Sequence, residues 1–289
     1  MRLMMFERDG MARLGVLVDG AQVIDAVACD PALPATLHDL IATGPDALAR
    51  LKGAIAQAPE SAKLALGEVT PALPIARPGK FVCVGLNYAA HAREGGHEIP
   101  EYPSLFVRWS SSLVAAGAPV ILPRVSAQLD YEAELTIVIG TGGRHISEAS
   151  ALDHVFGYTL FNDVSVRDYQ RKSNQWTPGK NFDGTGPLGP VVVTPDELPA
   201  GASGLRITSR VNGETRQDSN TADMIFSTAK IIAILSEFMT LAPGDVIATG
   251  TPSGVAHAMK PPGWLKAGDT VDVEIEEIGV LSNPVFAES

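Results

Sequence analysis

Cysteine is scarce in this chain, which has only Cys29 and Cys83 among 289 residues. Two cysteines are too few for a disulfide framework or a thiolate metal site, so we expect both to be buried free thiols. Positive charge is also low: 22 Lys and Arg residues stand against 33 Asp and Glu residues, which gives a net charge of −11. Because the basic residues form no cluster, the sequence predicts no nucleic-acid partner.

Long apolar runs are missing as well. No run approaches the roughly 18 apolar residues of a membrane span, and the opening MRLMMFERDG has no apolar signal core. We therefore expect a cytoplasmic protein with no membrane partner. The 45% hydrophobic fraction, together with 28 Gly and 21 Pro, is typical of a turn-rich folded chain.

The first 70 or so residues have the pattern of a small α/β module. Asp19-Gly20 separates two short apolar runs, which predicts a hairpin. Thr36 is a suitable cap for one helix, and Pro45 for the start of a second. The proline-rich stretch 70–80, TPALPIARPGK, could not be a continuous helix or a central strand. We place a domain boundary there, with a small N-terminal α/β domain over residues 1–72 and a larger domain over 73–289.

The stretch 129–143, LDYEAELTIVIGTGG, carries acidic residues along what otherwise has the composition of a buried strand. Side chains alternate between the faces of a strand, so Glu132 and Glu134 share one face. If that face is buried, two carboxylates need a cation, and Mg²⁺ prefers carboxylate oxygens. Alternation alone equally allows an edge strand with a solvated acidic face.

Asp163 ends the next apolar run, VFGYTLFND, just before the helical pattern SVRDYQRK. An Asp between a strand and a helix usually caps the helix. As a third carboxylate, it would instead complete a set of oxygen ligands with Glu132 and Glu134. The two roles are compatible.

Four further residues carry groups suited to chemistry. His91 and Glu94 are three residues apart in a short helical pattern, within hydrogen-bonding reach of each other, and a carboxylate raises the basicity of an imidazole. The alternative is a surface pair on a mobile loop. Lys180 lies in a Gly-rich loop, and Thr251 lies in ATGTPSGV, where small residues would let backbone N–H groups approach an anionic ligand. A solvated lysine and a plain turn are the alternatives.

Taken together, these segments resemble the fumarylacetoacetate hydrolase family from about Phe81 to the C-terminus. The collinear motifs are VGLNYAAHARE, DYEAEL, GYTLFNDVSVRDYQ, PGKNF, NGETRQ, LAPGDVIATGTPSGV and GDTVDVEIEEIGVLSNPV. The resemblance implies an α+β fold, in which a mixed β roll or barrel follows a small N-terminal α/β domain. It also implies a homodimer.

The resemblance further implies roles for individual residues. A Mg²⁺ or Mn²⁺ site is implied at Glu132, Glu134 and Asp163, with His91 and Glu94 as a water-activating pair on a closing lid. Lys180 and Thr251 would hold substrate oxygen atoms, and the expected substrate-binding set is completed by Tyr88, Arg108 and Gly250. The family commonly has Lys-Pro where this chain has Arg108-Trp109, a departure that bears on substrate choice. A further glycine of several relatives is absent after GTPSGV, which leaves the shape of that cavity edge open.

The activity implied by the resemblance is hydrolysis of a carbon–carbon bond in a 2,4-diketo acid of the acylpyruvate type. His91 would take a proton from water, while the metal and Lys180 hold the charge of the departing pyruvate enolate. Decarboxylation of an oxaloacetate-like acid, and keto–enol or dienoate isomerisation, need the same enolate stabilisation and stay open as alternatives. An alternative of another class is a non-catalytic metal-binding regulatory protein.

Overall fold

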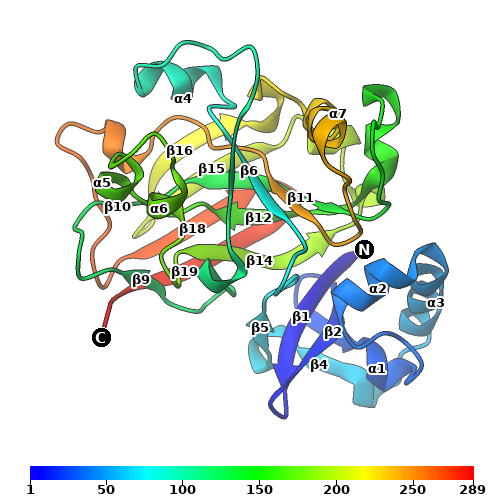
Figure 1. The fold of residues 1–289 in the computed structure, drawn as a ribbon. Coiled ribbons are helices and arrows are strands. Elements are labelled where there is room, and N and C mark those ends of the chain that lie inside the picture. The colour runs from blue at the N-terminus through cyan, green and yellow to red at the C-terminus, as the bar shows by residue number, and fades with distance from the viewer.

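The computed structural model describes residues 1–289 and is dominated by β-sheets (Figure 1). The largest sheet has 12 strands, and its main path follows the order β4-β3-β2-β1-β14-β12-β11-β17-β6-β7. At its margins β5 pairs with β1, and β8 pairs with β14. The strands of this sheet are β1 (Arg2–Arg8), β2 (Met11–Val18), β3 (Gln22–Asp25), β4 (Lys63–Ala65), β5 (Thr70–Ala72), β6 (Phe81–Gly85), β7 (Ser104–Val107), β8 (Leu113–Val114), β11 (Ala133–Ile139), β12 (Val155–Asn162), β14 (Gly186–Val193) and β17 (Val246–Ala248).

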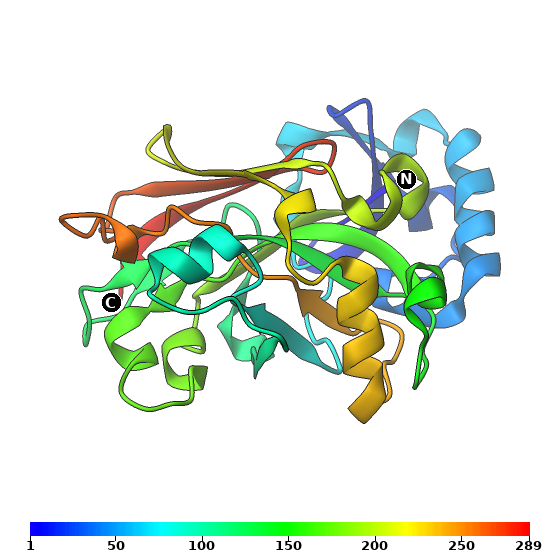
Figure 2. The same cartoon turned by 90° about the horizontal axis from the view of Figure 1, so that it is seen from above.

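A second sheet of five strands, in the order β16-β15-β18-β19-β9, packs against the first. Figure 2 shows its red strands, β18 and β19, lying beside the green strands of the large sheet. Leu135 and Ile137 of β11 share one apolar core with Ile207 of β15 and Val273 of β18. This packing of two sheets gives the α+β roll expected from the sequence. The remaining strands are β9 (Val120–Leu122), β15 (Arg206–Val211), β16 (Glu214–Asn220), β18 (Thr270–Ile275) and β19 (Gly279–Ala287), with β10 (Leu129–Asp130) and β13 (Ser165–Val166) forming a separate pair.

The N-terminal module forms as predicted. The Asp19-Gly20 turn joins β2 to β3, and the hydroxyl of Thr36 accepts from Asp39 N–H at 3.1 Å at the start of α2. Pro45 begins α3, because its missing N–H costs nothing in the first turn. The helices here are α1 (Ala26–Cys29), α2 (Leu37–Thr43) and α3 (Pro45–Ala56). β1 pairs with β14, so one continuous sheet joins the module to the rest, and the boundary at residues 72–73 stays a prediction.

β11 is a central strand, paired with β12 on one side and β17 on the other. The edge-strand alternative for the acidic stretch is therefore wrong. Side chains along β11 alternate as expected. The apolar residues at odd-numbered positions pack in the core between the two sheets, and they are Ala133, Leu135, Ile137 and Ile139. Val138, on the opposite face, packs in a different apolar core. Regular strand structure is interrupted at Tyr131 and Glu132, between β10 and β11.

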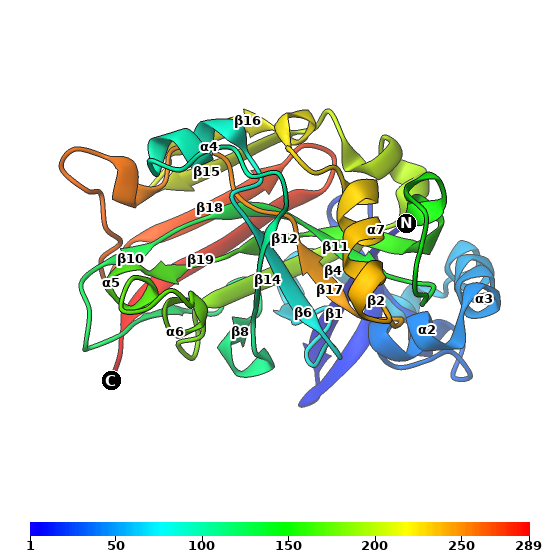
Figure 3. The same ribbon diagram turned by 45° about the horizontal axis from the view of Figure 1, so that its top comes forward.

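Three short helices frame the place where β11 begins and β12 ends. Figure 3 shows α4 on one side of the strands, with α5 and α6 on the other. The helices of this larger part are α4 (Ala89–Glu94), α5 (Arg167–Gln170), α6 (Thr177–Lys180) and α7 (Thr228–Phe238). None of the helices combines the length and the apolar character needed to cross a membrane.

Candidate metal centre and active site

Three carboxylates meet beside the ends of β11 and β12. Glu132 precedes β11, Glu134 is its second residue, and Asp163 directly follows β12. Strand register aligns Ala133 with Asn162, and Asp163 N–H donates to the Glu132 carbonyl at 2.9 Å. One oxygen from each of the three carboxylates lies within 4.8 Å of the others, and all three residues are buried. Strand pairing therefore assembles the acidic cluster that the sequence predicts.

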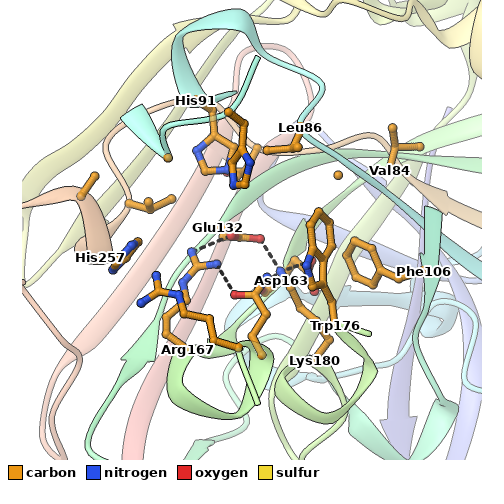
Figure 4. A pocket seen from close by; sticks show the side chains of 18 of the residues that line it. Val84, Leu86, His91, Phe106, Glu132, Asp163, Arg167, Trp176, Lys180 and His257 are labelled. Atoms are coloured by element: carbon orange, nitrogen blue, oxygen red, sulfur yellow. Dashed lines mark hydrogen bonds and ion pairs between the residues drawn. The ribbon is translucent and has the colours of Figure 1, made fainter. Parts of the chain in front are cut away.

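Three cations, Arg108, Arg167 and Lys180, neutralise two of these carboxylates; Figure 4 shows Arg167 and Lys180 beside Glu132 and Asp163. Lys180 Nζ lies 2.5 Å from Glu132 Oε2 and 2.6 Å from Asp163 Oδ2. Arg167 Nη2 donates to Glu132 Oε1 at 2.6 Å, and Arg108 Nε donates to Asp163 Oδ1 at 2.8 Å. Two like charges 4 Å apart repel by about 4 kcal/mol at an effective dielectric constant of 20, so the cluster requires this compensation.

Lys180 is held in the cluster by the packing of α6 against α5. Gly179 makes this possible, because a Cβ there would lie 2.5 Å from backbone atoms of Gln170. Lys180 is only 2% exposed, so the solvated-lysine alternative is wrong. Burial disfavours its charge, but Asp163 and Glu132 outweigh burial and raise the pKa of Lys180 above its ordinary value. Lys180 is therefore an ammonium donor.

Glu134 has no cationic partner of its own; the N–H of Gly250 donates to its Oε2 at 3.0 Å. Burial, and then the charges of Asp163 and Glu132, raise the pKa of Glu134 well above its usual range. A divalent cation would relieve this repulsion, and a donor set made only of carboxylate oxygens suits Mg²⁺ or Mn²⁺. The three residues therefore fit a metal ion. The capping alternative for Asp163 is wrong, because Val166 is the N-cap residue of α5.

His91 and Glu94 pair on α4 as their spacing predicts. His91 Nδ1 lies 2.9 Å from Glu94 Oε1, and Figure 4 shows the imidazole above Glu132. An ionised carboxylate only accepts hydrogen bonds, so Nδ1 carries the hydrogen, and in the neutral imidazole Nε2 is the nitrogen that can accept a proton. Both oxygens of Glu94 also accept from Gly254 N–H, at 3.2 and 3.0 Å. This contact ties α4 to the loop after β17, unlike a surface pair on a mobile loop.

The carboxylates, Lys180 and the His91–Glu94 pair line a single cavity of about 580 Å³. Thr251 also lines it, as expected, and is 3% exposed. The Thr251 hydroxyl accepts from Gln217 Nε2 at 2.8 Å, so its own hydrogen is free to donate into the cavity. The loop ATGTPSGV is therefore more than a plain turn.

Three residues expected to bind substrate do not line this cavity. The Arg108 side chain is fully buried against Asp163. Gly250 N–H is already used by Glu134. Tyr88 is 1% exposed, and burial raises the pKa of its hydroxyl. Their placement contradicts direct contact with substrate: Arg108 and Gly250 each hold a carboxylate of the cluster, and Tyr88 lies in the core.

The lining residues that sequence reasoning did not single out include four large side chains that bear on ligand binding: Arg167, Arg171, Trp176 and His257. Arg167 had a detectable signal, because it follows Asp163 by four residues, about one turn in the predicted helix, and could be expected on the same face. His257 lies just after GTPSGV, where this chain lacks a glycine that several relatives have. The sequence therefore marked this stretch as unusual but gave His257 no role. Trp176 had no local signal, since its partner Phe106 is distant in sequence; their ring centroids are 5.5 Å apart.

The fold is a β roll, and three buried carboxylates lie beneath a histidine at the ends of its strands. Together, fold and site are those of a metal-dependent enzyme. The chain belongs to the fumarylacetoacetate hydrolase family: the family model described as "Fumarylacetoacetate (FAA) hydrolase C-terminal" matches residues 80–286. The resemblance drawn from the sequence motifs is confirmed.

Relatives match almost the whole chain. "Oxaloacetate tautomerase fahd2, mitochondrial" of Xenopus laevis is 43% identical over 99% of this chain and 90% of its own length. "Oxaloacetate tautomerase YisK" of Bacillus subtilis is 41% identical over 94% of this chain and 95% of its own. Among solved structures, maleylpyruvate hydrolase from Sphingobium sp. SYK-6, in complex with manganese(II) and pyruvate, is 29% identical, with a TM-score of 0.83 and full coverage of both chains.

Proposed function

We propose that this protein catalyses the keto–enol tautomerisation of oxaloacetate, or of a closely similar 2-oxo acid, with Mg²⁺ or Mn²⁺ as cofactor. The observation that carries the proposal is the buried cluster of Glu132, Glu134 and Asp163, which shares one cavity with the base His91. Similarity over almost the whole chain to two proteins named oxaloacetate tautomerases supports this reaction more strongly than the hydrolysis expected from the sequence.

The reaction requires one proton to leave C3 of the keto acid and one proton to reach O2. His91 Nε2 is a free base, so it takes the C3 proton, and Glu94 stabilises the resulting imidazolium. Lys180 lines the same cavity and places positive charge near the developing enolate oxygen. Return of the proton from His91 to O2 completes the enol, and the reverse transfers restore the keto form. A divalent ion held by the three carboxylates would supply Lewis-acid polarisation of the 2-oxo group.

Hydrolysis of an acylpyruvate is the second candidate. The same His91–Glu94 pair could take a proton from water instead of carbon, and the structural similarity to a maleylpyruvate hydrolase supports this reading. Decarboxylation would use the same enolate stabilisation. A non-catalytic regulatory role has less support, because the base, the ammonium group and the carboxylates share one cavity.

The test is a direct comparison of the reactions. Enol oxaloacetate is diluted into buffer, and its conversion is followed by ultraviolet absorbance with Mg²⁺, with Mn²⁺ and with EDTA. Because metal ions and buffer also promote this conversion, the blank is the Glu132→Gln variant at equal concentration. Parallel assays measure pyruvate released from 2,4-dioxopentanoate and from oxaloacetate. Metal-dependent conversion of the enol well above the blank is expected; pyruvate release from 2,4-dioxopentanoate without enol conversion would contradict the proposal and support hydrolysis.

A further inference from the structure

The cavity has two chemically different sides. Figure 4 shows Trp176 and Phe106 on one side of the Glu132–Asp163 pair, and Arg167 and His257 on the other. The Trp176 side is apolar and tightly packed, since a Cβ on the lining residue Gly85 would lie 2.2 Å from Trp176 Cζ3. A substrate bound at the carboxylate cluster therefore meets apolar groups in one direction and nitrogen donors in the other.

The charge of Arg167 is already neutralised, because its guanidinium pairs with the carboxylates of Asp130 and Glu132. Its Nε donates to Asp130 Oδ2 at 2.8 Å, its Nη2 donates to Glu132, and its Nη1 donates to Gln170 Oε1 at 3.0 Å. Arg167 is 5% exposed and belongs to the structural support of Glu132.

Arg171 lies one residue after α5 and also lines the cavity, but it has a different environment. It is exposed, and no carboxylate lies within ion-pair distance of its guanidinium. Gln170, next to it, also lines the cavity and keeps its amide N–H₂ free, because the contact with Arg167 uses the amide oxygen. Arg171 and Gln170 therefore both present free donor groups along this wall.

His257 adds a third nitrogen group to the same wall. Its Nδ1 is buried without a hydrogen-bond partner, and its ring stacks on Trp264 with centroids 5.9 Å apart. Arg167, Arg171 and His257 line the same cavity, and burial, followed by the charges of Arg171 and Arg167, lowers the pKa of His257. Arg171 is thus the one cation of this wall without a carboxylate partner, and in a chain of net charge −11 an unpaired cation inside a cavity is suited to an anionic ligand.

We propose that Arg171 binds the far carboxylate of the substrate, with Gln170 and His257 beside it, and so makes the enzyme selective for 2-oxo dicarboxylic acids. This inference rests on the proposed function, in which the 2-oxo end of the substrate binds at the metal cluster. Arg171 is a specificity residue and takes no part in proton transfer.

The experiment compares oxaloacetate with 2-oxosuccinamate, in which a neutral amide replaces the far carboxylate. For Arg171→Gln, kcat/KM for oxaloacetate should fall roughly 10- to 100-fold, the value of a charge-assisted hydrogen bond, while kcat/KM for 2-oxosuccinamate stays unchanged. Arg171→Lys should restore part of the preference. The matched control is Lys172→Gln, because Lys172 is the exposed neighbouring cation but lies over the Tyr169 ring and outside the cavity lining.

Equal losses for both substrates would overturn the proposal, because they would mean that Arg171 acts only through the shape of the loop. An equal effect of Lys172→Gln would also overturn it, since any nearby positive charge would then suffice. If the wild-type enzyme converts neither substrate, the proposed function fails and the subsite is tested by binding. Calorimetry with Mg²⁺ should then show weaker oxaloacetate binding to Arg171→Gln, and unchanged 2-oxosuccinamate binding; equal binding of oxaloacetate by both proteins overturns the subsite too.

Discussion

Glu94 has two hydrogen-bonding partners, and both bear on the chemistry. Its carboxylate fixes the tautomer of His91, and it also accepts the N–H of Gly254 from the loop that carries Thr251. The base is therefore aimed only when α4 is docked on this loop. One side chain thus links the proposed base to the loop that carries Thr251, which is the arrangement expected of a lid that completes an active site.

His91→Ala is expected to lower kcat by roughly 100-fold or more, the usual scale for loss of a general base, and to change KM much less. Steady-state kinetics on enol oxaloacetate measures this. His145→Ala is the control, because His145 is exposed and lies outside the cavity lining. His97 also lines the cavity, so His97→Ala is measured in parallel; a His91 variant that keeps most of its rate, beside a slow His97 variant, would transfer the role to His97.

At the scale of elements, the sequence predicted best what depends on local geometry. The two-residue period of a strand placed Glu132 and Glu134 together, and helix spacing paired His91 with Glu94. Local patterns left the answer open where it depends on long-range packing. Lys180 reaches Glu132 across 48 residues of sequence, and only the packing of α6 on α5 makes its ammonium part of the cluster.

Arg108 also shows that local sequence patterns do not determine long-range packing; here a residue expected to contact substrate is buried. It follows strand β7, and the family resemblance implied that it binds substrate. In the structure its guanidinium turns inward, donating to Asp163 Oδ1 and to the Val164 carbonyl at 2.6 Å. No local pattern encodes this choice, because it depends on where β12 ends relative to β7. The homodimer expected from the family resemblance stays a prediction for the same reason: it depends on surfaces, not on a local period.

The loop after β17 supports a prediction about Gly250. Its φ is +96°, and a Cβ there would lie 2.8 Å from both the Val84 carbonyl and Asn87 Cβ. Gly250→Ala should push the loop away from β6 and withdraw its N–H from Glu134, so Mg²⁺ affinity should fall about tenfold or more, by loss of an outer-shell partner. Calorimetry of Mg²⁺ binding measures this.

Gly213→Ala is the matched control for Gly250→Ala. Gly213 also has a positive φ, +81°, but a Cβ there meets nothing within 4 Å. It should therefore cost only about 1–2 kcal/mol of backbone strain in the hairpin turn, and bind Mg²⁺ like the wild-type protein. Equal Mg²⁺ affinity of the two variants would show that backbone strain, and not the contact with Glu134, determines any loss.

At the scale of the whole molecule, the metal cluster joins parts of the chain that are far apart in sequence. Glu132 and Glu134 lie at β11, Asp163 follows β12, and Lys180 ends α6. The unfolded chain has no such arrangement of ligands, so a metal ion binds the folded state almost exclusively. Binding therefore stabilises the entire fold, including the N-terminal module that shares the large sheet through β1 and β14.

Thermal unfolding should consequently depend on Mg²⁺. At a concentration 100 times its Kd, a ligand of the folded state adds about 2.7 kcal/mol, which should raise the Tm by a few degrees. Glu134→Gln should abolish this rise, because the amide keeps the shape of the ligand but lacks its charge. Without metal, the same variant should unfold no earlier than the wild-type protein, since burial and the neighbouring carboxylates already disfavour a charge on Glu134. Glu148→Gln, at an exposed carboxylate remote from the cluster, should respond to Mg²⁺ as the wild type does. An equal Mg²⁺-dependent rise in Tm for Glu134→Gln would place the ion elsewhere, and a lower metal-free Tm for that variant would mean that the Glu134 carboxylate stabilises the fold even without the ion.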